Sequence, residues 1–521
     1  MANTLNLGDG NWGVKDSSLL GYAKDNTKFV PETFDVTRAS GGTRVNKSGL
    51  IETPTEILSG DLVINGDFAT DSDWTKGSGW TISGGKAIAS NVSASCFQTS
   101  SFVSGKAYKV TYTISDYVSG DFKVQVGSSG FGQTRTSNGT FTEYIDYSGS
   151  NFLYIKGSSS FNGSIDNISV VEVNQDNLAR IDYTDGADGV LLTEPQSTNL
   201  VTDSEDFSDN SWTKIRTLVT PNSVISPEGS VNASTLSVSG ATGGEEFIRV
   251  SSLDSNEATC SFYVKKGNWR YITIRSVNNS VFDFDTETFT LTGTDETLSF
   301  DKLNDGWYRL KASSPTRSYC SIGFAATATT PSAGSGVDGT NVYIWGAQIE
   351  EQSYATSYIP TYGAIATRSG DLVTNGGSVT NFNSEEGVLF AEIAALSQDA
   401  NFQLGLFGTA NEQIRFEFQG GVIKAQLFNG AYQANMSSGA ITLTDNHKIA
   451  FKYKENDFAL WVDGVEVATD TSGNTLSVNE LTKLNLTSST GAAAVVEAKT
   501  SQIQVFNTAL SDSELQILTT I

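Results

Sequence analysis

Several residue types that enzymes and metalloproteins rely on are scarce in this 521-residue sequence, which has 1 His, 3 Cys, 2 Met and 8 Pro. Any Ser–His–Asp arrangement would have to use the single histidine, His447. No G-x-S-x-G, phosphate-binding or H-E-x-x-H motif occurs. Only a pair of carboxylates stays open as catalytic machinery, because the 58 acidic residues supply such pairs by chance. The sequence therefore predicts no enzyme.

Long apolar runs are also missing, and no stretch reaches the roughly 18 residues that a membrane-spanning helix needs. The first residues, "MANTLNLGDGNWG", lack the basic and apolar regions of a signal peptide. We therefore expect no membrane insertion and no export by the usual secretory route.

Basic residues are few, with 33 Lys+Arg against 58 Asp+Glu and a formal net charge of −25. Such a charge repels phosphate backbones, so nucleic acid is not an expected partner. The three cysteines, Cys96, Cys260 and Cys320, have no C-x-x-C spacing and predict no zinc site. Buried free thiols are the favoured interpretation, and a Cys260–Cys320 pair is the alternative.

What the sequence does contain is typical of an all-β protein, because 50 Gly and many Ser, Thr and Asn separate short alternating stretches. Residues 106–115, 269–277, 414–419 and 458–464 alternate as half-buried strands do. One helix is predicted over residues 508–518, where a Ser and a Glu three residues later form a capping box.

A duplicated stretch divides the chain, since "NGDFATDSDWTK" at residues 65–76 returns as "SEDFSDNSWTK" at residues 204–214. After each copy come strands, which close at residues 163–173 and 339–351. Two copies of one sandwich module are the interpretation, with the repeat as their opening strand and its Phe and Trp closing one end of each core. A third block from about residue 385 has longer antiparallel strands and tight hairpin turns.

Each block resembles a known family. Asn65, Gly66, Asp67, Phe68 and Trp74, with "IDNISV" at residues 165–170, resemble the first and last strands of jelly-roll carbohydrate-binding modules. The second block keeps Asp206, Phe207 and Trp212 but departs at its end. The third block resembles a laminin-G or concanavalin-like sandwich through "FALWVDGVEVA" and "IQVFNTALSDSEL".

The stretches between the blocks resemble connecting segments of tailed-bacteriophage fibre or appendage proteins. They are "FDVTRASGGTRVNKSGLIE" (34–52), "ARIDYTDGADGVLLTEPQSTNLV" (179–201) and "TSYIPTYGAIATRSGD" (356–371). In that family the first stretch runs almost directly into the second, so the first jelly roll reads as an insertion, which costs little more than loop closure. The predicted fold is all-β, with tandem sandwiches: two jelly rolls, then a concanavalin or laminin-G-like sandwich. Its expected divisions are an N-terminal virion-attachment segment (1–57), an inserted jelly roll (58–175), a connector (176–200), a second jelly roll (201–360), a connector (361–384) and the third sandwich (385–521).

The resemblance implies a virion-surface protein, made in the host cytoplasm, that attaches through its N-terminal segment to other virion proteins and binds host-surface or environmental glycans. Fibre, appendage and capsid decoration are all open, and family habit implies a homo-oligomer, usually a trimer. The alternatives are a tail-associated polysaccharide depolymerase, a non-viral secreted carbohydrate-binding adhesin, and a decoration protein without a ligand.

Sugar rings stack on aromatic side chains, so aromatics that do not fit the core alternation are the candidate glycan contacts. These are Trp80, Tyr117, Tyr147, Trp269 and Trp307, each with core packing as the alternative. No cofactor is required. The jelly-roll resemblance implies a structural calcium at Asp67 and Asp166, with ordinary turn hydrogen bonds as the alternative.

Overall fold

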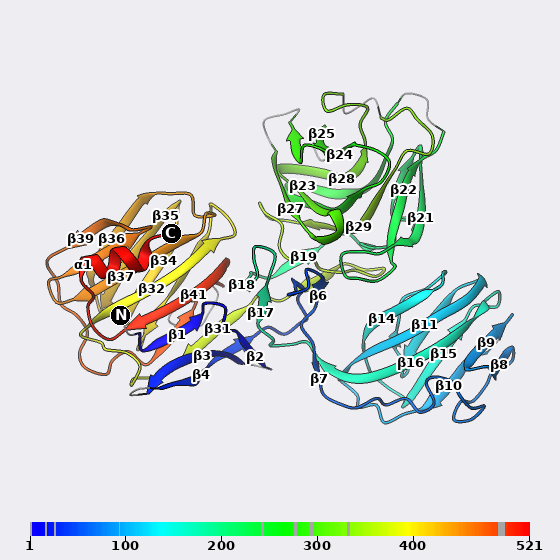
Figure 1. The fold of residues 1–521 in the computed structure, drawn as a ribbon, viewed down its shortest axis with the longest axis horizontal. Coiled ribbons are helices and arrows are strands. Elements are labelled where there is room, and N and C mark those ends of the chain that lie inside the picture. The colour runs from blue at the N-terminus through cyan, green and yellow to red at the C-terminus, as the bar shows by residue number, and fades with distance from the viewer. Residues whose placement is uncertain are drawn as a thin grey trace.

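The computed structural model describes residues 3–15, 18–25, 28–92, 94–240, 244–275, 279–291, 296–330, 334–487 and 495–521. Figure 1 shows three separate lobes built almost wholly of strands. The predicted fold class is confirmed, because the chain folds as tandem β-sandwiches. Among the described residues no helix is long and apolar enough to cross a bilayer.

The first sandwich has one sheet in the order β14-β11-β16-β9-β8, with β7 added on β16, and a second sheet in the order β10-β15-β12-β13. Inward residues alternate along β11, where Tyr108, Val110, Tyr112 and Ile114 are buried. This alternation is the one predicted from the sequence. The strands are β7 (Glu56–Ile57), β8 (Trp80–Ser83), β9 (Lys86–Ser90), β10 (Cys96–Thr99), β11 (Ala107–Ser119), β12 (Phe122–Val126), β13 (Gly130–Phe131), β14 (Gly139–Asp146), β15 (Phe152–Gly157) and β16 (Asn162–Asn174).

The second sandwich is one sheet, in the order β21-β22-β29-β23-β28-β24-β25-β26, that folds over because its two longest strands bend at bulges. β20 pairs with β23, β27 pairs with β28, and β19 pairs with β30 beside the sandwich. The elements are β19 (Ser197–Asn199), β20 (Thr213–Ile215), β21 (Thr217–Val224), β22 (Ala233–Val238), β23 (Phe247–Lys266), β24 (Tyr271–Arg275), β25 (Asn279–Asp283), β26 (Thr288–Thr290), β27 (Thr297–Lys302), the short 3-10 turn η1 (Asn304–Gly306), β28 (Trp307–Phe324), β29 (Asn341–Glu350) and β30 (Ala366–Arg368).

A disulfide joins Cys260 on β23 to Cys320 on β28 inside this core, with their Cα atoms 6.1 Å apart. The favoured expectation of free thiols is therefore wrong for this pair. The bend in the two strands places the cysteines opposite each other, although 60 positions separate them in the sequence. Cys96 is free, and burial raises the pKa of its thiol to about 12.

The C-terminal sandwich is a single run of paired strands that folds over into two facing layers. Hydrogen bonds link β39-β38-β37-β32-β41-β1-β3-β4-β31-β40-β33-β34-β35-β36 in that order. The later strands are β31 (Leu372–Gly376), β32 (Glu386–Ala395), β33 (Asn401–Phe407), β34 (Glu412–Gln419), β35 (Val422–Asn429), β36 (Tyr432–Ala440), β37 (His447–Lys454), β38 (Phe458–Val462), β39 (Val465–Asp470), β40 (Lys483–Leu486) and β41 (Ala498–Phe506).

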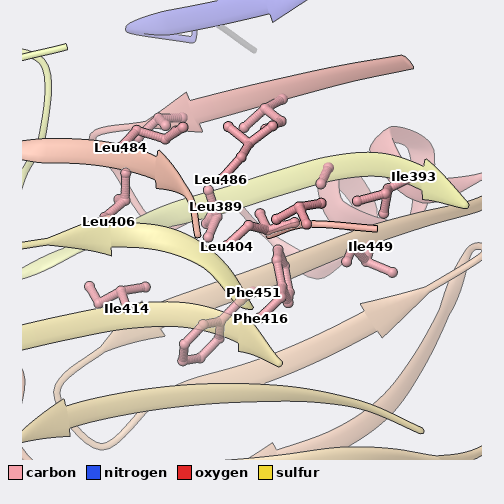
Figure 2. Packing of buried hydrophobic residues seen from close by; sticks show 14 of the residues in the cluster. Leu389, Ile393, Leu404, Leu406, Ile414, Phe416, Ile449, Phe451, Leu484 and Leu486 are labelled. Carbon is pink, nitrogen blue, oxygen red and sulfur yellow. The ribbon is translucent and has the colours of Figure 1, made fainter. Parts of the chain in front are cut away.

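Buried aliphatic and aromatic side chains fill the space between these two layers (Figure 2). The side chains labelled in Figure 2 are Leu389 and Ile393 from β32, Ile449 and Phe451 from β37, Leu404 and Leu406 from β33, Ile414 and Phe416 from β34, and Leu484 and Leu486 from β40.

The helix α1 (Asp512–Thr519) begins with the predicted capping box, in which Ser511 and Glu514 satisfy each other's backbone N–H groups.

The N-terminal strands β1 (Leu5–Gly8), β2 (Gly13–Lys15), β3 (Ser18–Asp25) and β4 (Lys28–Thr37) belong to this same lobe. β1 pairs with β41 and β4 pairs with β31, so these strands connect the two layers along one side. Leu7 and Phe34 are buried in the C-terminal core. The expected division that sets residues 1–57 apart as an N-terminal attachment segment therefore differs from the structure, because these strands pair with the other end of the chain.

Apart from Thr213 and Lys214, which begin β20, the duplicated stretches lie outside the strands, which corrects their prediction as opening strands. Their aromatic pairs do close the cores as predicted: the ring centroids of Phe68 and Trp74 lie 5.1 Å apart, and those of Phe207 and Trp212 lie 5.0 Å apart. In each copy the indole N–H donates to the backbone carbonyl nine residues earlier, at 3.1 and 3.0 Å. The repeated sequence thus encodes the same aromatic pair, which closes one end of each core.

The three connecting stretches meet in a buried group of charges that we call the arginine hub: Arg38, Arg180, Arg368, Glu194 and Asp371. Arg38 Nη1 lies 2.7 Å from Asp371 Oδ1, and Arg180 Nη1 lies 2.6 Å from Glu194 Oε2. Arg180 also pairs with Asp371, and Arg368 lies 3.3 Å from Glu194. Burial alone would raise the pKa of Asp371, but Arg180, Arg38 and Arg368 lower it to about 2.

Two further pairings hold the connecting stretches near the C-terminal sandwich and the arginine hub. β17 (Arg180–Asp182) pairs with β18 (Val190–Thr193), which in turn pairs with β41. The short hairpin β5 (Arg44–Val45) and β6 (Ile51–Glu52) contacts the second sandwich. The N–H of Ile51 donates to the carbonyl of Pro227 at 3.0 Å, and Asn304 Nδ2 donates to the carbonyl of Ser48 at 2.8 Å. The segments that resemble phage connectors are therefore ordered structure between the lobes.

Candidate functional site

Three of the five predicted glycan contacts are buried. The exposed fractions of Trp80, Tyr147 and Trp307 are 5%, 3% and 2%. The first two rings lie in the core of the first sandwich, and Trp307 lies in a small cluster with Trp345. A ring enclosed in this way offers no face to a sugar, so core packing accounts for these three residues. Trp345 is itself fully buried.

Tyr117 and Trp269 are half-buried and lie on different sandwiches, so the structure does not bring them together. The ring of Tyr117 packs 6.4 Å from that of Phe161. The indole N–H of Trp269 donates to the carbonyl of Ala325 at 2.8 Å. Both side chains therefore make contacts within their own sandwich.

The two predicted calcium ligands make turn hydrogen bonds. Asp67 Oδ1 accepts from the N–H of Ala69 at 3.3 Å, and Asp166 Oδ1 accepts from the N–H of Asn167 at 2.6 Å. Within the described part of the chain, no group of three or more His, Cys, Asp and Glu side chains is placed to hold a metal ion. Calcium at these positions stays a prediction.

The solvent face of the sheet β10-β15-β12-β13 carries an unusual set of side chains. Across this face the register places Phe97 beside Tyr154, Tyr154 beside Gln125, and Gln125 beside Phe131. Phe152 lies two positions along β15 from Tyr154, on the same face. We call Phe97, Phe131, Phe152 and Tyr154 the aromatic platform.

The rings of the aromatic platform contact one another but stay accessible. The ring centroids of Phe97 and Phe152 lie 5.5 Å apart, those of Phe97 and Tyr154 lie 5.5 Å apart, and those of Phe152 and Tyr154 lie 5.7 Å apart. Phe131 is 54% exposed, and the other three rings are half-buried. Large apolar rings on a solvated sheet face are the feature that requires an explanation, since single exposed apolar residues are ordinary.

Two lysines and one amide complete this face. Lys123 Nζ lies 4.9 Å from the ring centroid of Phe131, and Lys156 Nζ lies 5.0 Å from that of Tyr154. Burial first, and Lys123 second, lower the pKa of Lys156. Gln125 is only 4% exposed, and its Nε2 donates to the carbonyl of Gly127 at 2.7 Å, while its Oε1 has no partner.

Sequence reasoning missed the aromatic platform because it searched for aromatics outside the strand alternation. The platform residues obey that alternation on its outer phase: in β15, Leu153 and Ile155 point inward while Phe152, Tyr154 and Lys156 point outward. The signal in the sequence is the series of aromatic residues at the outward-facing positions of these strands, where polar residues are expected.

A cleft of about 1140 Å³ lies between the second sandwich, the C-terminal sandwich and the connecting stretch at residues 182–190. Its charged groups neutralise one another, because Lys499 Nζ lies 2.6 Å from Asp185 and Lys311 Nζ lies 2.7 Å from Asp301. Burial opposes the charge of Lys499, but Asp185 raises its pKa overall. The cleft therefore offers fewer free polar groups than its size suggests.

Two neighbouring groups engage the ring of the single histidine, His447. His447 Nδ1 lies 2.7 Å from Asp463 Oδ2, and its Nε2 lies 2.9 Å from the carbonyl oxygen of Thr442. Both ring nitrogens are thus engaged where β37 begins, next to the predicted hairpin turn between β38 and β39.

Comparison with known proteins finds one family match, within the last lobe. Residues 378–516 match the concanavalin A-like lectin/glucanases superfamily, which agrees with the laminin-G or concanavalin-like resemblance. No curated protein matches the chain. The solved structures that match include the N-terminal tandem CBM22 domain of Paenibacillus barcinonensis Xyn10C, at 13% identity and a TM-score of 0.20 over 57% of this chain and all of that one.

Sialidases of Trypanosoma rangeli also match. The complex with sialic acid is 11% identical and has a TM-score of 0.22, over 99% of this chain and 92% of that one. Another structure, of Trypanosoma rangeli sialidase, matches at 10% identity and a TM-score of 0.20, over 99% of this chain and 93% of that one. These matches overturn the expectation that the chain is no enzyme. At TM-scores this low, the matches carry no argument for any particular reaction of this chain.

Proposed function

We propose that the protein is a surface component of a tailed-bacteriophage virion whose β-sandwiches bind glycans, with the aromatic platform as one glycan-binding face. The observation that carries the proposal is the platform itself: four rings share one solvated sheet face, and two of them, Tyr154 and Phe131, flank the amide of Gln125, whose buried oxygen has no partner. Aromatic rings stack on the apolar faces of sugars, and a convergent amide orients their hydroxyls.

Two further observations support glycan binding by this chain. The C-terminal lobe matches a superfamily that is described by its lectins and glucanases. The formal net charge of −25 keeps a densely displayed surface protein soluble. A homo-oligomer, with three subunits as the first expectation, would let several weak sites bind one polymer at once and so raise the overall affinity.

The virion assignment rests on the resemblance of residues 34–52, 179–201 and 356–371 to phage connectors. The arginine hub gives these stretches a physical role, since each supplies charged members of one buried network. Because β1 to β4 are committed to the C-terminal sandwich, attachment to other virion proteins would use an outer surface of that lobe.

Glycan binding is tested by applying the full chain and its variants to an array of bacterial polysaccharides. Phe131→Ala and Tyr154→Ala should each weaken binding roughly three- to tenfold, because one aromatic contact contributes about 0.5–1.5 kcal/mol. Tyr432→Ala is the control, since Tyr432 is a half-exposed ring on the C-terminal sandwich. A silent array, or a double variant that binds like the wild type, would refute the proposal. Counting reducing ends in the same wells decides between binding alone and cleavage.

Placement on the virion needs a separate experiment. An antibody raised against residues 385–521 should label intact particles in electron micrographs, and the label would distinguish capsid, neck and tail. Particles that carry no label, from a phage that expresses the protein, would remove the virion assignment and leave glycan binding untouched.

A further inference from the structure

Two like charges lie directly opposite each other on the face that carries the aromatic platform. The register pairs Lys123 of β12 with Lys156 of β15. Both side chains point away from the core, because their neighbours Phe122, Val124 and Ile155 point into it. Like charges in directly opposed positions destabilise a sheet. Their presence on one face therefore requires a compensating interaction.

The protein itself supplies no carboxylate for that compensation. Within the described part of the chain neither lysine forms an ion pair, although acidic residues outnumber basic ones, 58 to 33. Each ammonium group lies over a ring instead: Lys156 Nζ is 5.0 Å from the centroid of Tyr154 and 5.6 Å from that of Phe131. Cation–π contacts of this kind hold the lysines over the platform and leave their N–H groups free for an anion.

We propose that the lysine pair makes the aromatic platform selective for acidic polysaccharide, with a uronate carboxylate held between Lys123 and Lys156. This inference rests on the proposed glycan binding and names the class of glycan. The carboxylate relieves the repulsion between the two ammonium groups. The sugar rings lie against Tyr154 and Phe131, beside the two ammonium groups.

The spacing of these groups suits a short stretch of polymer. Gln125 lies two positions along β12 from Lys123, which corresponds to about 7 Å along a strand. Phe131 and Tyr154 flank Gln125 on the two adjacent strands. Anion and stacking contacts are thus arranged on one four-stranded surface, where little side-chain ordering remains to oppose binding.

The test compares polygalacturonate with the same polymer after complete methyl esterification, so that only the carboxylate charge changes. The full chain should bind polygalacturonate more tightly, and the difference should shrink as salt concentration rises. Lys123→Gln and Lys156→Gln should each weaken binding to polygalacturonate by up to about fivefold, the range of an exposed ion pair. The double variant should bind both polymers equally and weakly. Lys109→Gln, on the outer face of the opposite sheet, is the charge-matched control and should change nothing.

A second measurement separates lost recognition from lost folding. Without glycan, Lys156→Gln should melt at the same temperature as the wild type or higher, because the substitution removes a like-charge contact. Equal binding of the two polymers by the wild type, or a preference that survives in the double variant, would overturn the charge selectivity while glycan binding stands. Binding of neutral glycans alone would overturn it too. If no glycan binds and Phe131→Ala has no effect, the proposed function fails together with it.

Discussion

Replacing Asp371 by Asn tests whether the arginine hub holds the three lobes together. Asp371 accepts hydrogen bonds from Arg38, at 2.7 Å, and from Arg180, and it also accepts the N–H of Glu194 at 3.0 Å. The three arginine side chains of the hub are 0–1% exposed, so none of them can turn to water. After the substitution Glu194 is the one carboxylate left in the hub, and it pairs with Arg180 and Arg368 but not with Arg38.

The expected cost is that of a buried charge left without its partner, about 3–5 kcal/mol. This is a large part of the 5–15 kcal/mol that typically stabilises a domain. The pH dependence has a defined sign. Because the arginines lower the pKa of Asp371 to about 2, its contribution is complete above the ordinary carboxyl pKa of about 4 and is lost as the pH falls towards 2.

Hydrogen exchange at pH 7, followed by mass spectrometry, measures this effect in the connecting stretches directly. Amides in residues 179–201 should exchange about two orders of magnitude faster or more in the Asp371→Asn variant. Glu386→Gln is the matched control, because Glu386 forms a surface ion pair with Lys454 at 2.9 Å that contributes at most about 1 kcal/mol. Equal exchange in the two variants would show that the hub does not stabilise the junction.

Two further predictions concern the second sandwich. Cys260→Ala should lower the melting temperature of this lobe, because the disulfide to Cys320 closes a separation of 60 residues and contributes about 2–4 kcal/mol. If reductant leaves the thermal unfolding transition of the wild type unchanged in calorimetry, this prediction is contradicted. Burial first, and repulsion from Glu228 second, raise the pKa of Glu205 to about 8. Between about pH 4.5 and pH 8 the folded state therefore keeps a proton that the unfolded chain has released. The free energy of unfolding should fall as the pH rises through this range. Glu205→Gln should flatten that decline in melting temperature, and an unchanged slope would refute the assignment.

Local patterns predicted the fold class well. Alternation identified strands such as β11, and the capping box of Ser511 and Glu514 identified the helix. The duplicated Phe and Trp identified two related cores. These features depend on neighbours within a few positions, so the printed sequence contains them in full.

Features that depend on distant partners could not be read in this way. The pairing of β1 with β41 joins segments about 500 positions apart, and the disulfide depends on the bend in β23 and β28. The aromatic platform depends on the register of four strands, and only that register shows that its outward residues share one surface. Searching for aromatics one at a time therefore selected core residues such as Trp307.

The pairing of β1 with β41 also determines the order in which the parts of this protein can fold during synthesis. The two middle sandwiches are contiguous in the chain and can close while synthesis continues. The earliest strands must wait, with open edges, until nearly every later residue has emerged. Exposed strand edges promote aggregation, so the interval between the first and last strands is the period in which the nascent chain most needs a chaperone.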